Sequence, residues 1–102
     1  MSVRYSPEAL ADIDGILADI EKKSAQGASN VARAIENTIQ LCEQFPHSFP
    51  QTNRPGIRRI PIVKYPYTIF YKSLGGEPGV VIMRVVHSAS VRNLNKMPRK
   101  RR

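Results

Sequence analysis

The sequence predicts one α+β domain, in which a short strand and an antiparallel helical hairpin pack on a mainly antiparallel sheet, in the order β-α-α-β-β-β. Two segments of the first half repeat apolar residues at helical spacing, and three runs of the second half are rich in β-branched and aromatic residues. Because 102 residues leave room for one core, we expect a single domain over 1–102, with a basic, flexible tail at 93–102.

The first helix is expected directly after a short strand at 3–5. Ser6 offers a capping hydroxyl, Pro7 fits the first helical position, and Glu8 lies near the positive end of the helix dipole. The apolar residues at helical spacing are Leu10, Ile13, Ile16, Leu17 and Ile20. The carboxylates between them are expected to face solvent rather than to form an acid–base or metal site. They are Asp12, Asp14, Asp19 and Glu21.

A second amphipathic helix is expected over 30–45. Gly27 is expected to stop the first helix, and Ser29 or Asn30 to cap the second. So short a connection favours an antiparallel hairpin. The single cysteine, Cys42, lies on the apolar stripe of this helix and is expected to be a buried thiol of a protein in a reducing, cytoplasmic compartment.

Turn-forming residues at 46–56 predict an irregular connection before three strands, at 57–63, 65–72 and 79–86. The connection between the second and third strands has the length of a hairpin loop. These strands would form the sheet on which the helical hairpin packs.

The last of these runs is apolar on both faces apart from Arg84, which predicts an inner strand. An arginine in an inner strand requires an acidic or polar partner, or an open cleft above it. Regular alternation would put Ile82 and Arg84 on one face, and Val85 and His87 on the other.

Charge is divided unevenly along the chain. Residues 1–43 carry four basic and seven acidic side chains, a net charge of −3, whereas residues 44–102 carry twelve basic and one acidic side chain, a net charge of +11. Such asymmetry implies an electropositive face and an acidic partner, either nucleic acid or protein. Neither a membrane-spanning run nor a metal-binding cluster nor a phosphate-binding glycine loop is evident, so we expect no membrane contact, metal or cofactor.

Three stretches resemble the RelE/ParE family of toxins: residues 5–9 (YSPEA), 56–71 (GIRRIPIVKYPYTIFY) and 82–87 (IMRVVH). The resemblance implies the toxin of a type II toxin–antitoxin system, with the fold described above. It also implies neutralisation by a cognate acidic antitoxin whose flexible segment wraps the helices and the sheet. The residues that it suggests for antitoxin binding are Leu17, Ile20, Arg33, Ile35 and Ile39.

The family divides into toxins that poison DNA gyrase by direct contact and toxins that cleave mRNA on the ribosome. Metal-independent RNA cleavage needs an acid, a base and a cation at the phosphorus. Arg84 and His87 are the candidates, but they are three residues apart, on opposite faces of a regular strand, and no carboxylate base is evident.

The run at 65–71, preceded by two arginines, is more similar to the gyrase-poisoning branch. We therefore expect a non-enzymatic gyrase inhibitor with no catalytic residues. A ribosome-dependent endoribonuclease that uses Arg84 and His87 is the alternative, and a non-toxic nucleic-acid-binding member of the same fold is a third. The residues expected to contact the target are Arg58, Arg59, Lys64, Tyr65, Arg84, His87 and Arg92.

Overall fold

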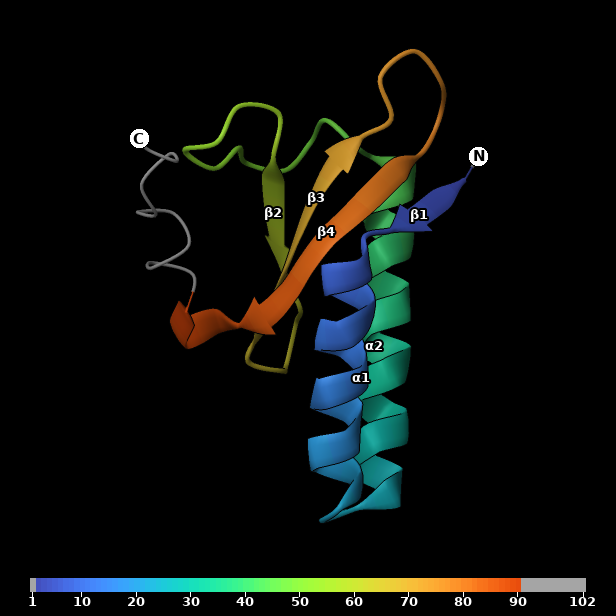
Figure 1. The fold of residues 1–102 in the computed structure, drawn as a ribbon, viewed down its shortest axis with the longest axis vertical. Coiled ribbons are helices and arrows are strands. Elements are labelled where there is room, and N and C mark those ends of the chain that lie inside the picture. The colour runs from blue at the N-terminus through green and yellow to red at the C-terminus, as the bar shows by residue number, and fades with distance from the viewer. Residues whose placement is uncertain (1, 91–102) are drawn as a thin grey trace.

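Two helices cover one face of a four-stranded mixed sheet in the computed structural model, which describes residues 2–90 (Figure 1). The elements are, in order, β1 (Val3–Tyr5), α1 (Pro7–Glu21), α2 (Ala25–Gln44), β2 (Arg58–Pro61), β3 (Tyr67–Ser73), β4 (Val80–His87) and a 3₁₀ turn, η1 (Ser88–Ser90). The predicted fold class and order of elements are therefore confirmed. Within the described residues, no helix is long and apolar enough to cross a membrane.

Ser6 caps helix α1, as predicted, and also fastens the helix to the sheet. Its side-chain oxygen accepts a hydrogen bond from the Ala9 N–H at 2.9 Å, and its hydroxyl donates to the Met83 carbonyl at 2.8 Å. The Ser6 N–H donates to the Ile82 carbonyl at 2.9 Å. One residue therefore begins α1 and fixes its start against β4.

The turn between the helices lies earlier in the chain than the sequence predicts. Helix α1 ends at Glu21, and α2 begins at Ala25 after an N-cap at Ser24, whose hydroxyl oxygen accepts from the Gly27 N–H at 2.8 Å. The prediction that Gly27 stops the first helix was wrong, because Gly27 lies in the first turn of α2. A Cβ atom at Gly27 would come within 3.3 Å of the Ile20 side chain, so glycine there permits close packing of the two helices.

The sheet has the strand order β1-β4-β3-β2, so β4 is an inner strand, as its two apolar faces predict. Strands β2, β3 and β4 are antiparallel, whereas β1 runs parallel to β4. Because β1 pairs only with residues 80–82, it leaves the edge of β4 beyond Ile82 without a neighbouring strand. Helix α1 packs against β4 there instead.

A β-bulge in β4 breaks the alternation that the sequence predicts. Tyr71 pairs with Ile82 and Phe70 pairs with Arg84, so the register passes over Met83. As a result Ile82 and Val85, which regular alternation would put on opposite faces, are both buried in the core. Arg84, which follows the bulge, lies on the face of the sheet away from this core.

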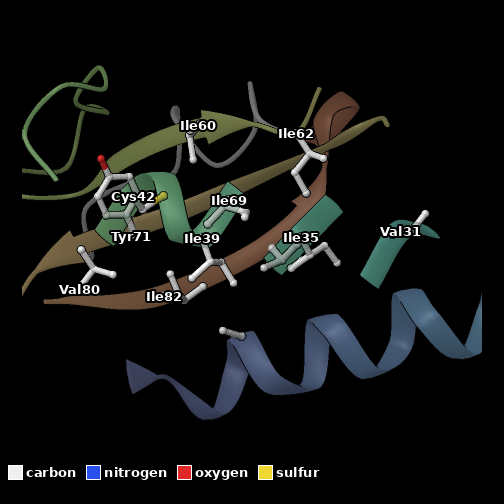
Figure 2. Packing of buried hydrophobic residues seen from close by; sticks show 12 residues of the cluster. Val31, Ile35, Ile39, Cys42, Ile60, Ile62, Ile69, Tyr71, Val80 and Ile82 are labelled. Atoms are coloured by element: carbon white, nitrogen blue, oxygen red, sulfur yellow. The ribbon is translucent and has the colours of Figure 1, made fainter. Parts of the chain in front are cut away.

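The core lies between the helices and the sheet (Figure 2). Its buried residues are Ala9, Val31, Ile35, Ile39, Cys42, Ile60, Ile62, Ile69, Tyr71, Val80, Ile82 and Val85. Cys42 is fully buried, as predicted, and burial raises the pKa of its thiol to about 12. The Tyr71 hydroxyl donates to the Pro46 carbonyl at 3.1 Å, which joins β3 to the chain just after α2.

Candidate functional site

Arg84 is held by a carboxylate of the first helix. Its Nε donates to Asp12 Oδ2 at 2.7 Å and its Nη2 to Asp12 Oδ1 at 3.1 Å, while the Val85 N–H donates to Asp12 Oδ2 at 3.0 Å. The hydrogen bond with Asp12 is the main reason that the pKa of Arg84 rises above its usual value. Asp12 thereby occupies the edge of β4 that β1 leaves uncovered, and fulfils the expectation that Arg84 needs a partner.

This contact overturns the expectation that Asp12 belongs to a solvated acidic face. The Asp12 side chain is only 17% exposed, whereas that of Asp19, on the same helix, is 83% exposed. A carboxylate that accepts three hydrogen bonds from another element serves to join α1 to β4.

His87 lies apart from Arg84. It pairs across the sheet with Tyr67, and the two rings meet edge to face at a centroid distance of 5.8 Å. Its Nδ1 accepts a hydrogen bond from the Ala89 N–H at 3.1 Å. Because the cross-strand partners of His87 and Arg84, Tyr67 and Phe70, are three residues apart, His87 and Arg84 point to opposite faces, as their own spacing predicts.

The carboxylates nearest these two residues belong to α1: Asp12 is bonded to Arg84, and Asp12 and Asp19 line a groove together with His87. Glu77 lies in the exposed β3–β4 loop, 3.9 Å from Arg4. The described residues also hold no group of three or more His, Cys, Asp or Glu side chains that would suit a metal ion.

Two adjacent arginines of β2 have different positions. Arg58 pairs with Tyr71 in the register, and its Nη1 donates to the Phe49 carbonyl at 2.7 Å. Arg59 pairs with Phe70, which in turn pairs with Arg84, so the two arginines flank Phe70 in one row across the sheet. The row lies on the face away from the helices, because the intervening positions, such as Ile60 and Ile69, face the core.

Lys64 and Tyr65, also expected to contact the target, lie in the turn between β2 and β3. Lys64 has a left-handed backbone conformation, with φ of 79°, which is uncommon for residues other than glycine. Both residues line a groove of about 370 Å³ between this turn and helix α2. Arg33 of α2 lies on the opposite wall, so the structure brings together residues that the sequence assigned to different partners.

The other residues suggested for antitoxin binding lie in less accessible positions. Ile35 and Ile39 are buried in the core and offer almost no surface to a partner. Leu17 and Ile20 are partly buried against the same core. Arg92, a suggested target contact, and the basic tail lie outside the described residues.

Two features escaped the sequence interpretation. The role of Asp12 has no local signal, since its partner lies 72 residues away. The second feature is the exposed side chain of Leu41, for which the sequence did contain a local signal. Leu41 lies off the apolar stripe of α2 that Val31, Ile35 and Cys42 define, and it is accordingly exposed.

The architecture is that of the RelE/ParE class of small toxins. It superposes on a structure of the chromosomal ParDE TA system from P. aeruginosa with a TM-score of 0.71 at 19% identity, covering 85% of this chain and 95% of that chain. It also matches the isolated E. coli RelE toxin, with a TM-score of 0.52 at 13% identity, covering 90% of this chain and 96% of that chain. A sequence comparison with curated proteins gave no match.

The sequence profile of one family matches most of the chain. Residues 3–92 match the family described as the ParE toxin of the type II toxin-antitoxin system, parDE. The chain therefore belongs to the ParE toxin family, whose members have an antitoxin partner.

Proposed function

We propose that this ParE-family toxin binds DNA gyrase directly in the cytoplasm and stalls it without cleaving RNA, and that a cognate antitoxin neutralises it. The observation that carries the proposal is the engagement of Arg84 by Asp12. A cation that must stabilise charge on a phosphorus has to be free to meet it, whereas two N–H groups of Arg84 are already committed to a carboxylate. Arg84 also points away from His87, the other member of the candidate nuclease pair.

The surface proposed for the gyrase contact is the sheet face away from the helices. It carries Arg59, with the exposed Lys72 further along β3. Arg84 lies in the same row, but two of its N–H groups are held by Asp12, so only its remaining N–H groups are open to a partner. Phe70 is itself buried, so this face offers a partner its basic side chains, which suit association with an acidic surface. Arg58 is less suitable, because its guanidinium is bonded to the backbone of Phe49.

The test is a supercoiling assay with purified gyrase, run beside a cleavage assay on translating ribosomes. We expect loss of supercoiling, accumulation of cleaved DNA and intact mRNA. Codon-positioned cuts in mRNA with normal gyrase activity would instead make the protein a ribosome-dependent nuclease. Silence in both assays would favour a non-toxic member of the fold.

Charge reversal locates the contact. Arg59→Glu is expected to raise the toxin concentration for half-inhibition of gyrase by about tenfold, because like charges would then oppose each other at the interface. Lys22→Glu makes the same change in charge at the exposed end of α1 and serves as the control. Equal effects of the two variants would remove the sheet face from the proposal.

His87→Ala separates inhibition from catalysis. A variant that folds and keeps most of its gyrase inhibition is the expected result, since His87 contributes only a partly exposed ring contact with Tyr67. Complete loss of toxicity in a folded His87→Ala protein would support the nuclease instead.

A further inference from the structure

We propose that the groove between helix α2 and the β2–β3 turn binds a single strand of nucleic acid. This binding goes beyond the proposed contact with gyrase and does not depend on it. We call the hollow the α2 groove; its volume of about 370 Å³ is large enough for a ligand. Helix α2 supplies one wall, including Asn30, Arg33 and Asn37, and residues 62–65 supply the other.

The polar side chains of the α2 groove offer positive charge and hydrogen-bond donors. Arg33 on α2 and Lys64 on the turn are cations on opposite walls, and both side chains act only as donors. Asn30 and Asn37 lie three residues before and four residues after Arg33, so all three share one side of the helix. No carboxylate is among the lining residues. A phosphate backbone in the groove therefore meets donors on both walls.

Both cations of the α2 groove are free to meet a ligand. Arg33 and Lys64 are exposed, and the ion pairs within residues 2–90 involve other cations: Arg4, Lys22 and Arg84. Lys64 also has the left-handed backbone conformation, with φ of 79°, that glycine would adopt at lower cost. Such strained positions are common at binding sites. This strain supports a role for the Lys64 side chain in binding.

Apolar side chains in the α2 groove suit the faces of bases. Leu41 of α2 is 43% exposed and Val63 of the turn is 78% exposed. Tyr65 adds a ring that packs partly against the core. Proteins that bind single strands combine a positively charged groove with side chains on which bases stack. A single strand exposes the faces of its bases, whereas a duplex stacks them on one another, so the α2 groove suits a single strand.

The two asparagines favour nucleic acid over an acidic polypeptide as the occupant. A side-chain amide carries a donor and an acceptor side by side, which matches the edge of a base, whereas a carboxylate can use only the donor. The Oδ1 atom of Asn30 already accepts from Gln26 Nε2 at 3.0 Å, which leaves its amide N–H groups for a ligand. Asn37 is exposed, and its side chain makes no hydrogen bond within residues 2–90. Its donor and its acceptor are therefore both available.

A second groove, between α1 and the ends of β3 and β4, has a different charge. Asp12, Asp19 and His87 are its ionisable residues apart from Tyr67. The exposed Asp19 would repel a phosphate backbone there. Charge therefore selects the α2 groove of these two for a nucleic-acid strand.

The α2 groove also lies apart from the surface proposed for gyrase. Its turn wall includes Ile62, which faces the core on the helix side of the sheet. Arg59 and Lys72 lie on the opposite face of the sheet. Occupation of one surface therefore leaves the other open, and Lys72 provides a control for the charge at the groove.

Fluorescence anisotropy with a labelled oligodeoxythymidylate of about 12 nucleotides tests the occupant, with the full chain and without gyrase. The competitors are a duplex and an abasic strand of the same length, and polyglutamate of the same charge. We expect the single strand to bind about fivefold or more tightly than each competitor, because stacking of even one base contributes that much. Equal affinity for the duplex or the abasic strand would mean contact with phosphates alone, and equal affinity for polyglutamate would mean a site for acidic polypeptides. Either result would overturn the proposal.

Three variants locate the contact with the phosphates. Arg33→Gln and Lys64→Asn each remove one positive charge at the α2 groove, and Lys72→Gln does so on the opposite face of the sheet. Asparagine is chosen at position 64 because it tolerates the left-handed conformation. Circular dichroism first establishes that each variant is folded.

The salt dependence of binding is the readout for these variants. Each groove variant should reduce the slope of log affinity against log salt concentration by about 0.7, the value for one lost phosphate contact of a single strand. The slope for Lys72→Gln should equal that of the unmodified protein. A fall in the slope for Lys72→Gln as large as that for the groove variants, or no fall in either groove variant, would overturn the proposal.

Photocrosslinking tests the contact with the bases. A strand that contains 5-bromouracil forms crosslinks under ultraviolet light with aromatic rings that it contacts, and mass spectrometry locates them. We expect a crosslink at Tyr65 that Tyr65→Leu abolishes and that Tyr67→Leu, at the second groove, preserves. Crosslinking at Tyr67 instead, or within residues 93–102 alone, would place the strand elsewhere and refute the proposal.

Discussion

At the scale of single residues, Asp12 connects parts of the chain that are distant in sequence. It accepts two hydrogen bonds from Arg84 and one from the Val85 N–H. Asp12→Ala would leave these donors without their partner at the edge of β4. Because Arg84 is partly exposed to solvent, which would compensate some of the loss, we expect the free energy of unfolding to fall by about 1–2 kcal/mol.

Urea denaturation measures this effect. Asp14→Ala is the control, because Asp14 is an exposed residue of the same helix and its loss should change the free energy of unfolding by less than about 0.5 kcal/mol. Similar values for the two variants would show that the Asp12–Arg84 contact contributes little to stability.

The buried thiol of Cys42 and the buried phenol of Tyr71 should make the stability of the fold sensitive to high pH. Burial raises the pKa of Cys42 from 9.0 to about 12 and that of Tyr71 from 10.0 to about 12. Above pH 9 the unfolded chain loses protons that the folded chain retains, so stability should fall as the pH rises towards 12. The slope for each group approaches about 1.4 kcal/mol per pH unit between its unfolded and folded pKa values.

Chemical denaturation from pH 7 to pH 11 tests this dependence. Cys42→Ala is expected to be less stable at neutral pH, because it leaves a small cavity, but to lose less of its remaining stability between pH 9 and pH 10. An identical pH profile in the two proteins would exclude Cys42 as a cause.

At the scale of secondary-structure elements, the helical hairpin depends on the N-cap of α2. This cap is Ser24, which precedes the predicted caps Ser29 and Asn30 in the chain. Ser24→Ala removes the acceptor for the Gly27 N–H and should lower the free energy of unfolding by about 1 kcal/mol. Ser29→Ala, at one of the positions expected to be the cap, should change it by less than about 0.5 kcal/mol, because Ser29 is an exposed residue inside α2. Thermal denaturation of both variants gives the comparison, and a larger loss from Ser29→Ala would contradict the assigned start of α2.

The edge strand β2 shows how this sheet limits pairing with other chains. The outward N–H of Arg59 donates to the Pro50 carbonyl at 3.0 Å, and Pro61 has no N–H to offer. Two positions of β2 therefore have no N–H to offer to a further strand.

At the scale of the whole molecule, net charge should control how fast the toxin meets an acidic antitoxin. The chain carries a formal charge of +8, concentrated in its second half. Raising the salt concentration from 50 to 500 mM should slow association by about tenfold or more while changing dissociation much less, because screening weakens long-range attraction. Stopped-flow fluorescence measures both rates, and a salt-independent association rate would show that steering by charge is unimportant.

Local patterns were sufficient to predict the elements and their order. The Ser6 cap depends on the side chains of a few successive residues, and the stripe through Val31 and Cys42 depends on a repeat within one helix. The two apolar faces of β4 marked it as an inner strand before its neighbours were known. Such features act over a turn of helix or along one strand, so they can be read from adjacent residues.

Contacts between distant segments decided the candidate sites. Asp12 looked like any other acidic residue of an amphipathic helix until the fold placed it beside Arg84, 72 residues later. The bulge at Met83 follows from the register with β3, and no local pattern in β4 predicted it. The groove between α2 and the β2–β3 turn, in turn, exists only because packing brings Arg33 of the helix opposite Lys64 of the turn. Each of these depends on the positions of two separately formed elements, which periodicity within either element does not specify.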